Sequence, residues 1–333
     1  MRLQVAVIGA GSWGTTVASL ASHNCPTILW ARNAEIAEEI NAERTNTRYL
    51  GTARVGRNLR ATASMAEAVL AADVVVMGVP SHGFRAMLEL VREHIRAWVP
   101  VISLAKGLEQ GTLLRMTEVI GEVLAGHPAG VLSGPNLARE IMSGHAAASV
   151  VAMEDETIVC ELQRVFKSPR FRVYTNQDVT GCEVGGALKN VIAIAAGMGD
   201  GLGVGDNTKA AVITRGLAEL TRLGVAMGGR PQTFAGLAGM GDLVATCMSP
   251  QSRNRYVGEQ LGKGRTIQEI IDEMHMVAEG VKTSRVVMEL AERYEIDMPI
   301  CREVYRVVNE GSTPSQAYRG LGRVDPGSEQ DPG

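Results

Sequence analysis

A glycine-rich turn near the N-terminus constrains the fold of this chain most strongly. The apolar run VAVIG leads into Gly9-Ala-Gly11-Ser-Trp-Gly14, and the helix-compatible run TTVASLASH follows. This Gly-x-Gly-x-x-Gly spacing between a strand and a helix is typical of dinucleotide-binding folds. In such folds Gly9 permits the tight turn, Gly11 lets a pyrophosphate approach the backbone, and Gly14 lets the helix pack against the strand. The motif predicts a NAD(P) site, and a structural glycine turn is the alternative.

The first half of the chain alternates strand-like and helix-like segments. This βαβ alternation predicts an α/β fold with a doubly wound, mainly parallel sheet, a Rossmann-like arrangement. The expected strands are 3–8, 27–31, 73–79, 99–103, 130–133, 148–152 and 172–174, and helical patterns cover 34–42, 64–71, 84–92 and 113–124.

After about residue 180 helical periodicity replaces the strand pattern. The expected helices are 183–196, 206–224, 253–261, 266–273, 280–293 and 299–308. We therefore expect a domain boundary near 180–188. The predicted domains are a dinucleotide-binding domain at 1–184, an all-α substrate and catalytic domain at 185–320, and a disordered, breaker-rich tail at 321–333.

The composition of the chain indicates which binding partners and which cellular compartment to expect. The net charge is −3 and no basic stripe is present, which argues against nucleic acid as a partner. The five cysteines and six histidines are scattered without a metal-ligand spacing, so no metal site is predicted. Reduced thiols and the absence of space for a leader before Leu3 predict a cytoplasmic protein. No apolar run of ~18 residues is free of glycine or charge, so no membrane span is expected.

Lys189 is the most unusual ionisable residue of the second half. It lies in the mostly apolar helical pattern 183–196, beside Gly185 and Gly186. A buried ammonium either shifts its pKa downward or meets an anion, and such a lysine suits general acid–base catalysis. The small neighbours are expected to leave room for a ligand. The alternative is a lysine whose amine reaches solvent from a partly buried helix.

Two basic residues follow strands of the predicted sheet. Arg32 lies 18 residues after Gly14, where NAD-selective folds usually carry Asp or Glu, so we expect NADPH to be accepted. Lys106 lies just beyond the strand at 99–103, at the sheet edge where ligands bind in open α/β folds. Each could also be an ordinary solvated side chain.

Polar residues also stand out in the helical half. Asp242 lies in a glycine-dense turn, where it could orient Lys189 or cap the helix that follows. Ser252, Arg253 and Asn254 combine a hydroxyl, a guanidinium and an amide at a helix start, a set that suits a phosphate or a carboxylate. A solvated basic helix face is the alternative for these three residues.

Together these segments resemble the bacterial-type NAD(P)-dependent glycerol-3-phosphate dehydrogenases. The resemblance is carried by GAGSWGT at 9–15, SLAKGLE at 103–109, VLSGPN at 131–136, the block at 181–220, TFAGLAGMGDLVATC at 233–247 and SRNRYVG at 252–258. It covers the chain from residue 3 to about 310. The chain departs from the usual pattern at Asn136, where the family has Ser or Thr, and at Leu137 and Cys182.

The resemblance implies reduction of dihydroxyacetone phosphate to sn-glycerol 3-phosphate with NADPH or NADH, for phospholipid synthesis. It implies a catalytic set of Lys189 as proton donor, with Lys106 and Asp242. The substrate set that it implies is Lys106, Gly134, Asn136, Lys189, Asp242, Ser252, Arg253 and Asn254. The cofactor set that it implies is Gly9, Gly11, Ser12, Trp13, Gly14, Arg32, Lys106, Ala138, Arg253, Val277 and Glu279.

Two other interpretations stay open from the sequence. A β-hydroxyacid-type dehydrogenase shares the domain order and a helix lysine, but its usual Gly-x-x-x-Lys-x-x-x-Asn pattern ends here in Ala193. A non-catalytic NAD(P)-binding sensor could keep the fold without turnover. The expected partner is a small phosphate substrate, and a homodimer stays open.

Overall fold

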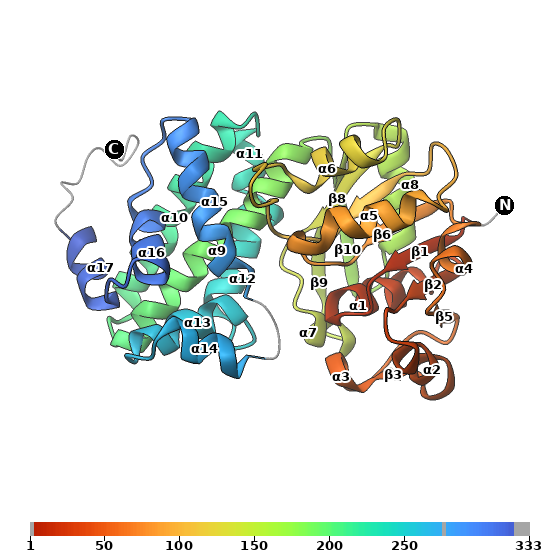
Figure 1. Ribbon diagram of the computed structural model, residues 1–333, viewed down its shortest axis with the longest axis horizontal. Helices are drawn as coiled ribbons and strands as arrows, with labels where there is room; N and C mark the ends of the chain where they lie inside the picture. The colour runs from red at the N-terminus through yellow and green to blue at the C-terminus, as the bar shows by residue number, and fades with distance from the viewer. Residues whose placement is uncertain (1–2, 275–277, 323–333) are drawn as a thin grey trace. The chain divides into compact units, whose positions relative to one another are not determined.

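The computed structural model describes residues 3–274 and 278–322 (Figure 1). Two compact units divide the chain. The first, which we call the sheet unit, comprises 1–109 and 114–179, and the second, the helical unit, comprises 110–113 and 180–333. The predicted fold class, a mainly parallel Rossmann-like sheet followed by helices, is confirmed.

An eight-stranded sheet forms the centre of the sheet unit, in the order β10-β9-β8-β7-β6-β1-β2-β5. All neighbouring strands are parallel except β8 and β9, which are antiparallel. The strands are β1 (Val5–Ile8), β2 (Thr27–Trp30), β5 (Leu59–Thr62), β6 (Val74–Met77), β7 (Val101–Ser103), β8 (Ala129–Ser133), β9 (Ala147–Met153) and β10 (Phe171–Asn176). A two-stranded sheet pairs β3 (Thr45–Asn46) with β4 (Gly51–Arg54).

Alternating strand side chains build two cores, one on each face of the sheet. Val5 and Val7 of β1 belong to one hydrophobic cluster, and Ala6 and Ile8 belong to the other. The first core includes residues of α1 (Ser12–Ala21), α2 (Ala34–Glu43) and α8 (Glu156–Phe166). The second includes residues of α4 (Met65–Val69), α5 (Phe84–Arg92) and α6 (Met116–Val123). The remaining helices here are α3 (Thr47–Leu50), the 3₁₀ turn η1 (Ser81–Gly83) and α7 (Ala138–Met142).

The strand order changes direction around β1, because β2 lies on one side of it and β6 on the other. This is a topological switch point, where ligands bind outside the carboxyl ends of the strands. The loops that follow β1, β2, β6, β7 and β8 all leave the sheet at that edge, since these strands are parallel. The predicted residues of the sheet unit lie in those loops or in the first turns of the helices that follow them.

The described part of the helical unit contains helices and no strand. Its elements are α9 (Val179–Leu202), α10 (Asp206–Ala226), α11 (Pro231–Phe234), a π-helical turn η2 (Leu237–Gly241), α12 (Asp242–Met248), α13 (Arg253–Gly262), α14 (Ile267–Glu273), α15 (Glu279–Arg293), α16 (Pro299–Asn309) and α17 (Pro314–Leu321). Of the predicted tail, Leu321 ends α17, and residues 323–333 lie outside the described residues.

Helix α9 is the core of the helical unit. It is long and apolar enough to span a membrane, but 94% of its most apolar window is buried inside the protein. Its backbone meets that of α13 closely: a Cβ added at Gly197 or Gly258 would collide with the carbonyl oxygens of Arg255 or Ile194. The glycines therefore let a second helix pack against α9 and enclose the side chains that it carries.

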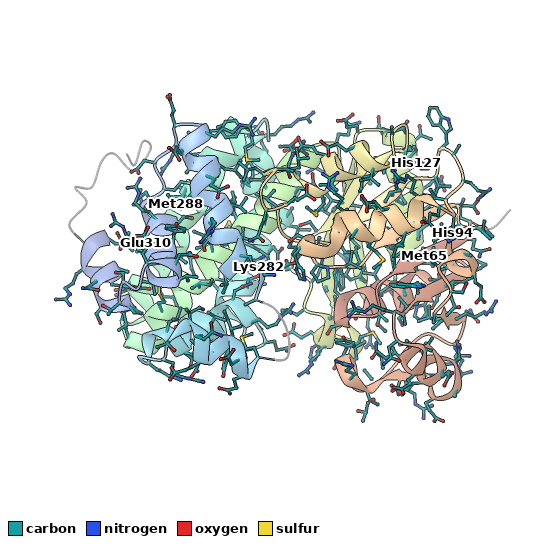
Figure 2. All side chains as sticks on the ribbon, in the orientation of Figure 1. Met65, His94, His127, Lys282, Met288 and Glu310 are labelled. Carbon is teal, nitrogen blue, oxygen red and sulfur yellow. The ribbon has the colours of Figure 1, made fainter. Side chains whose placement is uncertain are left out.

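The histidines do not assemble a metal site in the described residues. His94 and His127 are labelled in Figure 2, and His127 Nδ1 lies 2.9 Å from the carbonyl oxygen of Val99. Across residues 3–274 and 278–322, no group of three or more His, Cys, Asp or Glu side chains could hold a metal ion.

Candidate active site

The glycine turn joins β1 to α1 as its spacing predicts. Gly9 has φ +114°, and a Cβ there would lie 2.6 Å from the carbonyl oxygen of Gly78, which follows β6. A Cβ at Gly14 would collide with the carbonyl oxygen of Gly9, whereas one at Gly11 would meet nothing within 4 Å. Gly9 and Gly14 are thus required by packing. The open space at Gly11 fits the close approach of a pyrophosphate.

Ser12 and Trp13 begin helix α1. The Ser12 hydroxyl donates to the carbonyl oxygen of Tyr49 at 3.2 Å, and the Trp13 ring packs against Phe171 at a centroid distance of 6.3 Å. Both side chains are therefore engaged with protein. Their backbone N–H groups belong to the first helical turn, which has no intrahelical acceptors and suits an anion.

Arg32 follows β2 and is exposed. The next residue, Asn33, caps α2 by accepting a hydrogen bond from the backbone N–H of Glu35 at 2.8 Å. The cap fixes the backbone beside Arg32 and leaves its guanidinium on the surface. A guanidinium in this position can bind a phosphate in a bidentate manner.

Lys106 and the turn after β8 lie together. Lys106 Nζ donates to the carbonyl oxygen of Gly134 at 2.8 Å. Asn136 Nδ2 donates to Ser149 Oγ at 3.1 Å, and that hydroxyl donates to the carbonyl oxygen of Ser133 at 2.8 Å. These bonds tie β7, the turn after β8 and β9 into one cluster. Ala138 lies shortly after it, as the first residue of α7.

Ser149 was not predicted from the sequence. It is fully buried in an apolar strand, and only the antiparallel pairing of β8 with β9 brings it to the turn at 133–136. The other strand pairs of this sheet are parallel, and no local pattern in the sequence indicates that β8 and β9 are antiparallel.

In the helical unit, Lys189 and Asp242 form a buried ion pair. Lys189 Nζ donates to Asp242 Oδ1 at 2.6 Å and to Thr246 Oγ1 at 2.5 Å. The Thr246 hydroxyl in turn donates to the backbone carbonyl of Asp242 at 2.6 Å. Lys189 is 5% exposed and Asp242 is 2% exposed. The ammonium thus meets an anion inside the core, as burial requires.

Two expectations about this region are wrong. Gly185 was expected to leave room for a ligand, but a Cβ there would lie 2.7 Å from the carbonyl oxygen of Ala238, so the π-helical turn η2 fills the space. Of the two interpretations of Asp242, the contact with Lys189 is present and the helix cap is wrong, because α12 begins at Asp242 itself and Gly241 holds the cap position. The close approach of η2 to α9 brings the Asp242 carboxylate to Lys189.

Thr246 was also missed. It lies four residues after Asp242, one turn along α12, so both side chains lie on the same helix face. This spacing could have identified Thr246 once Asp242 was paired with Lys189.

The start of α13 holds the last predicted group. Ser252 caps the helix by accepting from the backbone N–H of Arg255 at 3.2 Å. Asn254 Nδ2 donates to Asn190 Oδ1 at 2.9 Å, and its Oδ1 accepts from the backbone N–H of Gly280 at 3.0 Å. The Asn254 side chain therefore holds α13 against α9 and α15, and Ser252 fixes the first turn of α13 itself.

Arg253 is exposed between these two anchored residues. Although the side chain reaches the surface, desolvation by neighbouring atoms lowers the pKa of the Arg253 guanidinium, and the negative charge of Glu279, at the start of α15, raises it. Two predicted cofactor residues thus lie within electrostatic range of each other. Val277, the third residue predicted near this position, lies outside the described residues.

Comparison with known proteins identifies a family. A family model described as NAD-dependent glycerol-3-phosphate dehydrogenase N-terminus matches residues 4–159, and its C-terminus counterpart matches residues 178–319. A glycerol-3-phosphate dehydrogenase [NAD(P)+] 2 of Sphingopyxis alaskensis is 61% identical over all of both chains. A glycerol-3-phosphate dehydrogenase [NAD(P)+] of Mycobacterium avium is 58% identical over 98% of this chain and 96% of its own.

A solved structure gives the same result. The crystal structure of glycerol-3-phosphate dehydrogenase from Coxiella burnetii matches with a TM-score of 0.92 and 36% identity. The match covers 97% of this chain and 99% of the other. Both units of the chain are therefore similar to those of one enzyme family, and the resemblance read from the motifs is confirmed.

Proposed function

The chain belongs to the NAD-dependent glycerol-3-phosphate dehydrogenase family, and from this premise we propose that it catalyses the reversible reduction of dihydroxyacetone phosphate to sn-glycerol 3-phosphate. NADPH or NADH is the reductant. The observation that carries the proposal is the buried ion pair of Lys189 and Asp242, because it holds a proton donor beside an anion inside the helical core.

The proton comes from Lys189 in this proposal. As a ketone is reduced, its oxygen gains negative charge and must receive a proton, and an ammonium at hydrogen-bond distance can supply it. Asp242 and Thr246 fix the position of Lys189 Nζ and stabilise its charged form. In the oxidation direction the neutral amine takes the proton back.

The cofactor set fits NAD(P) at the glycine turn. The space at Gly11 and the first N–H groups of α1 suit a pyrophosphate. The exposed Arg32 suits the 2′-phosphate of NADPH. When bound, the reduced nicotinamide supplies the hydride.

We assign the substrate phosphate to the start of α13. Arg253 is the charged group there, while Ser252 and Asn254 hold the helix start in place and remain candidate phosphate contacts. Lys106 is proposed to stabilise charge on the substrate, since its amine is fixed by the carbonyl of Gly134 and Asn136 lies in the same cluster. A bound phosphate orients the ketone and so lowers the entropic part of the barrier.

The wider setting follows from the same premise. We propose that the enzyme acts in the cytoplasm and supplies glycerol phosphate for phospholipid synthesis. A homodimer is the assembly to test first, because closed two-fold dimers are the commonest oligomers of soluble proteins.

The test is oxidation of NADPH in the presence of dihydroxyacetone phosphate, repeated with NADH. Parallel reactions contain 3-hydroxy acids with NADP+ or NAD+. Turnover restricted to dihydroxyacetone phosphate is expected. Turnover restricted to 3-hydroxy acids would favour the β-hydroxyacid type, and nucleotide binding without any turnover would favour a sensor.

A further inference from the structure

A buried asparagine is hydrogen-bonded to the glycine turn and has no part in the proposed chemistry. Asn46 of β3 is fully buried. Its Nδ2 donates to the carbonyl oxygen of Ala10 and to Thr15 Oγ1, both at 2.9 Å. One amide group therefore joins β3 to the turn and to the first part of α1.

All three backbone carbonyls of the turn at residues 9–11 face protein. The carbonyl oxygen of Gly9 is directed at Gly14, where a Cβ would collide with it. That of Gly11 accepts the first helical hydrogen bond from Thr15 at 2.9 Å. The carbonyl oxygen of Ala10 makes neither of these contacts. It accepts a hydrogen bond from the Asn46 side chain instead. The turn can therefore present N–H groups to an anion without an opposing carbonyl oxygen.

Asn46 also has an unsatisfied polar atom, which is unfavourable for an asparagine that serves stability alone. Its Oδ1 is buried and has no hydrogen-bond partner among the described residues. Burying an acceptor without a hydrogen-bond partner destabilises the folded protein. By contrast, Asn41 satisfies both ends of its amide on Ala61, donating at 2.8 Å and accepting at 2.9 Å. Asn46 keeps its donor bonds at the turn although its acceptor is left unpaired.

We infer that Asn46 is a positioning residue for the dinucleotide, which holds the Ala10 carbonyl away from the pyrophosphate so that the turn offers only amide donors. This inference rests on the proposed function, because it takes a dinucleotide as the ligand of the turn. The pyrophosphate is common to NADPH and NADH, so the effect of Asn46 is the same for both. Arg32, in contrast, acts on the 2′-phosphate of NADPH alone.

The test measures the dissociation constants of NADPH and NADH by fluorescence titration of the full-length protein. Asn46→Leu removes the amide at similar volume, and Asn41→Leu is the matched control because it removes an amide that bonds only to β5. We expect Asn46→Leu to raise both dissociation constants by about tenfold or more and by the same factor, since tenfold corresponds to the loss of about one hydrogen bond to a charged site. Asn41→Leu is expected to lower Tm and to leave both constants within about twofold.

Each other outcome decides the inference. A folded Asn46→Leu protein with wild-type constants for both nucleotides would overturn it, and so would equal losses of affinity in the Asn41→Leu control. If Asn46→Leu does not fold, Asn46→Ser is measured instead, and unchanged constants in that variant overturn the inference. A wild-type protein that binds neither nucleotide would overturn the proposed function itself, which separates the two failures.

Discussion

The two units differ in the kind of polar side chain that they bury in their cores. Within the described residues, four Asp, Glu, Lys or Arg side chains are buried in the helical unit: Glu183, Lys189, Glu219 and Asp242. In the sheet unit Asp178, next to its last residue, is the one buried ionisable side chain among the described residues. The other buried polar groups of the sheet unit are hydroxyls and the amide of Asn46.

The difference follows from how each architecture uses its backbone. Parallel strands end in loops, and the loop and helix N–H groups at the sheet edge are available for a ligand. The interior of a helix bundle offers no such groups, because helices satisfy their own N–H and C=O groups. A bundle must therefore supply polar chemistry from side chains, and these need partners such as Asp242 for Lys189. Binding is expected to depend on backbone shape in the sheet unit, and chemistry on individual side chains in the helical unit.

The largest effect is expected at Lys189. The Lys189→Met substitution removes the proton donor and should lower kcat by about 10²-fold or more, since general acid catalysis contributes ~10²–10⁴. The dissociation constant for NADPH should stay near that of the wild type, because the glycine turn lies in the other unit. Steady-state kinetics and NADPH titration check both statements.

A second substitution separates catalysis from stability at this pair. Lys189→Met leaves the Asp242 carboxylate buried without its cation, which is expected to cost ~3–5 kcal/mol. Adding Asp242→Leu should restore much of the free energy of unfolding and none of the turnover. Recovered activity in the double variant would show that Lys189 serves stability alone.

Next in size is the effect of a methyl group at the glycine turn. Gly14→Ala forces a Cβ against the carbonyl of Gly9, and overpacking of this kind costs ~1–3 kcal/mol or more, so NADPH affinity should fall by at least about tenfold. Gly11→Ala is the informative companion. It should leave Tm unchanged, because nothing lies within 4 Å, and should still weaken NADPH binding. Unweakened binding in Gly11→Ala would mean that no ligand occupies that space.

Arg32→Ala is expected to have a selective effect. NADPH affinity should fall by about tenfold, the value of one charge-assisted contact to phosphate, while NADH affinity should change by less than about twofold. Paired titrations with the two nucleotides measure the ratio. Equal losses for both nucleotides would contradict a contact with the 2′-phosphate.

The smallest effect concerns the pH dependence of stability in the helical unit. Burial raises the pKa of Glu219 from 4.5 to about 7, against the lowering effects of the Ile300 and Cys301 N–H groups and the charge of Arg222. A folded-state pKa above the unfolded value gives a contribution that is complete below pH 4.5 and is lost as pH rises through 7.

Glu219→Gln tests this sign. The Tm of the wild type relative to the Gln variant should fall by a few degrees from pH 5 to pH 8, since 1 kcal/mol moves Tm by roughly 2–4 °C in domains of 150–250 residues. Calorimetry at both pH values measures it. A gap in Tm that stays constant would show that Glu219 does not titrate in this range.

The sequence predicted the main strands and helices well, because their periodicity and bounding breakers are local signals. Expected strands at 27–31 and 99–103 correspond to β2 and β7 within two residues at each end. Strand β5 was missed, since Arg60 interrupts a short edge strand. Helix α17 was missed although Thr313 and Gln316 form a capping box at its start.

The sequence suggests which residues are candidates for the site, but it does not predict the contacts that those residues make. Lys189 and Asp242 are 53 positions apart in the sequence. No local pattern predicts that η2 brings Asp242 Oδ1 to 2.6 Å from Lys189 Nζ. The same holds for Ser149, which depends on an antiparallel pair, and for Asn46, whose role depends on a carbonyl 36 positions away. Long-range packing determined each of these contacts.

Chemical rescue is the sharpest test of proton transfer by Lys189. Lys189→Ala leaves space for a small amine beside Asp242, and dihydroxyacetone phosphate reduction is then measured with a series of primary alkylamines of different pKa. If Lys189 transfers the proton, added amines should restore turnover, with rescued rates that follow the amine pKa. Turnover that stays lost with every amine, in a protein that still binds NADPH and substrate, would contradict it.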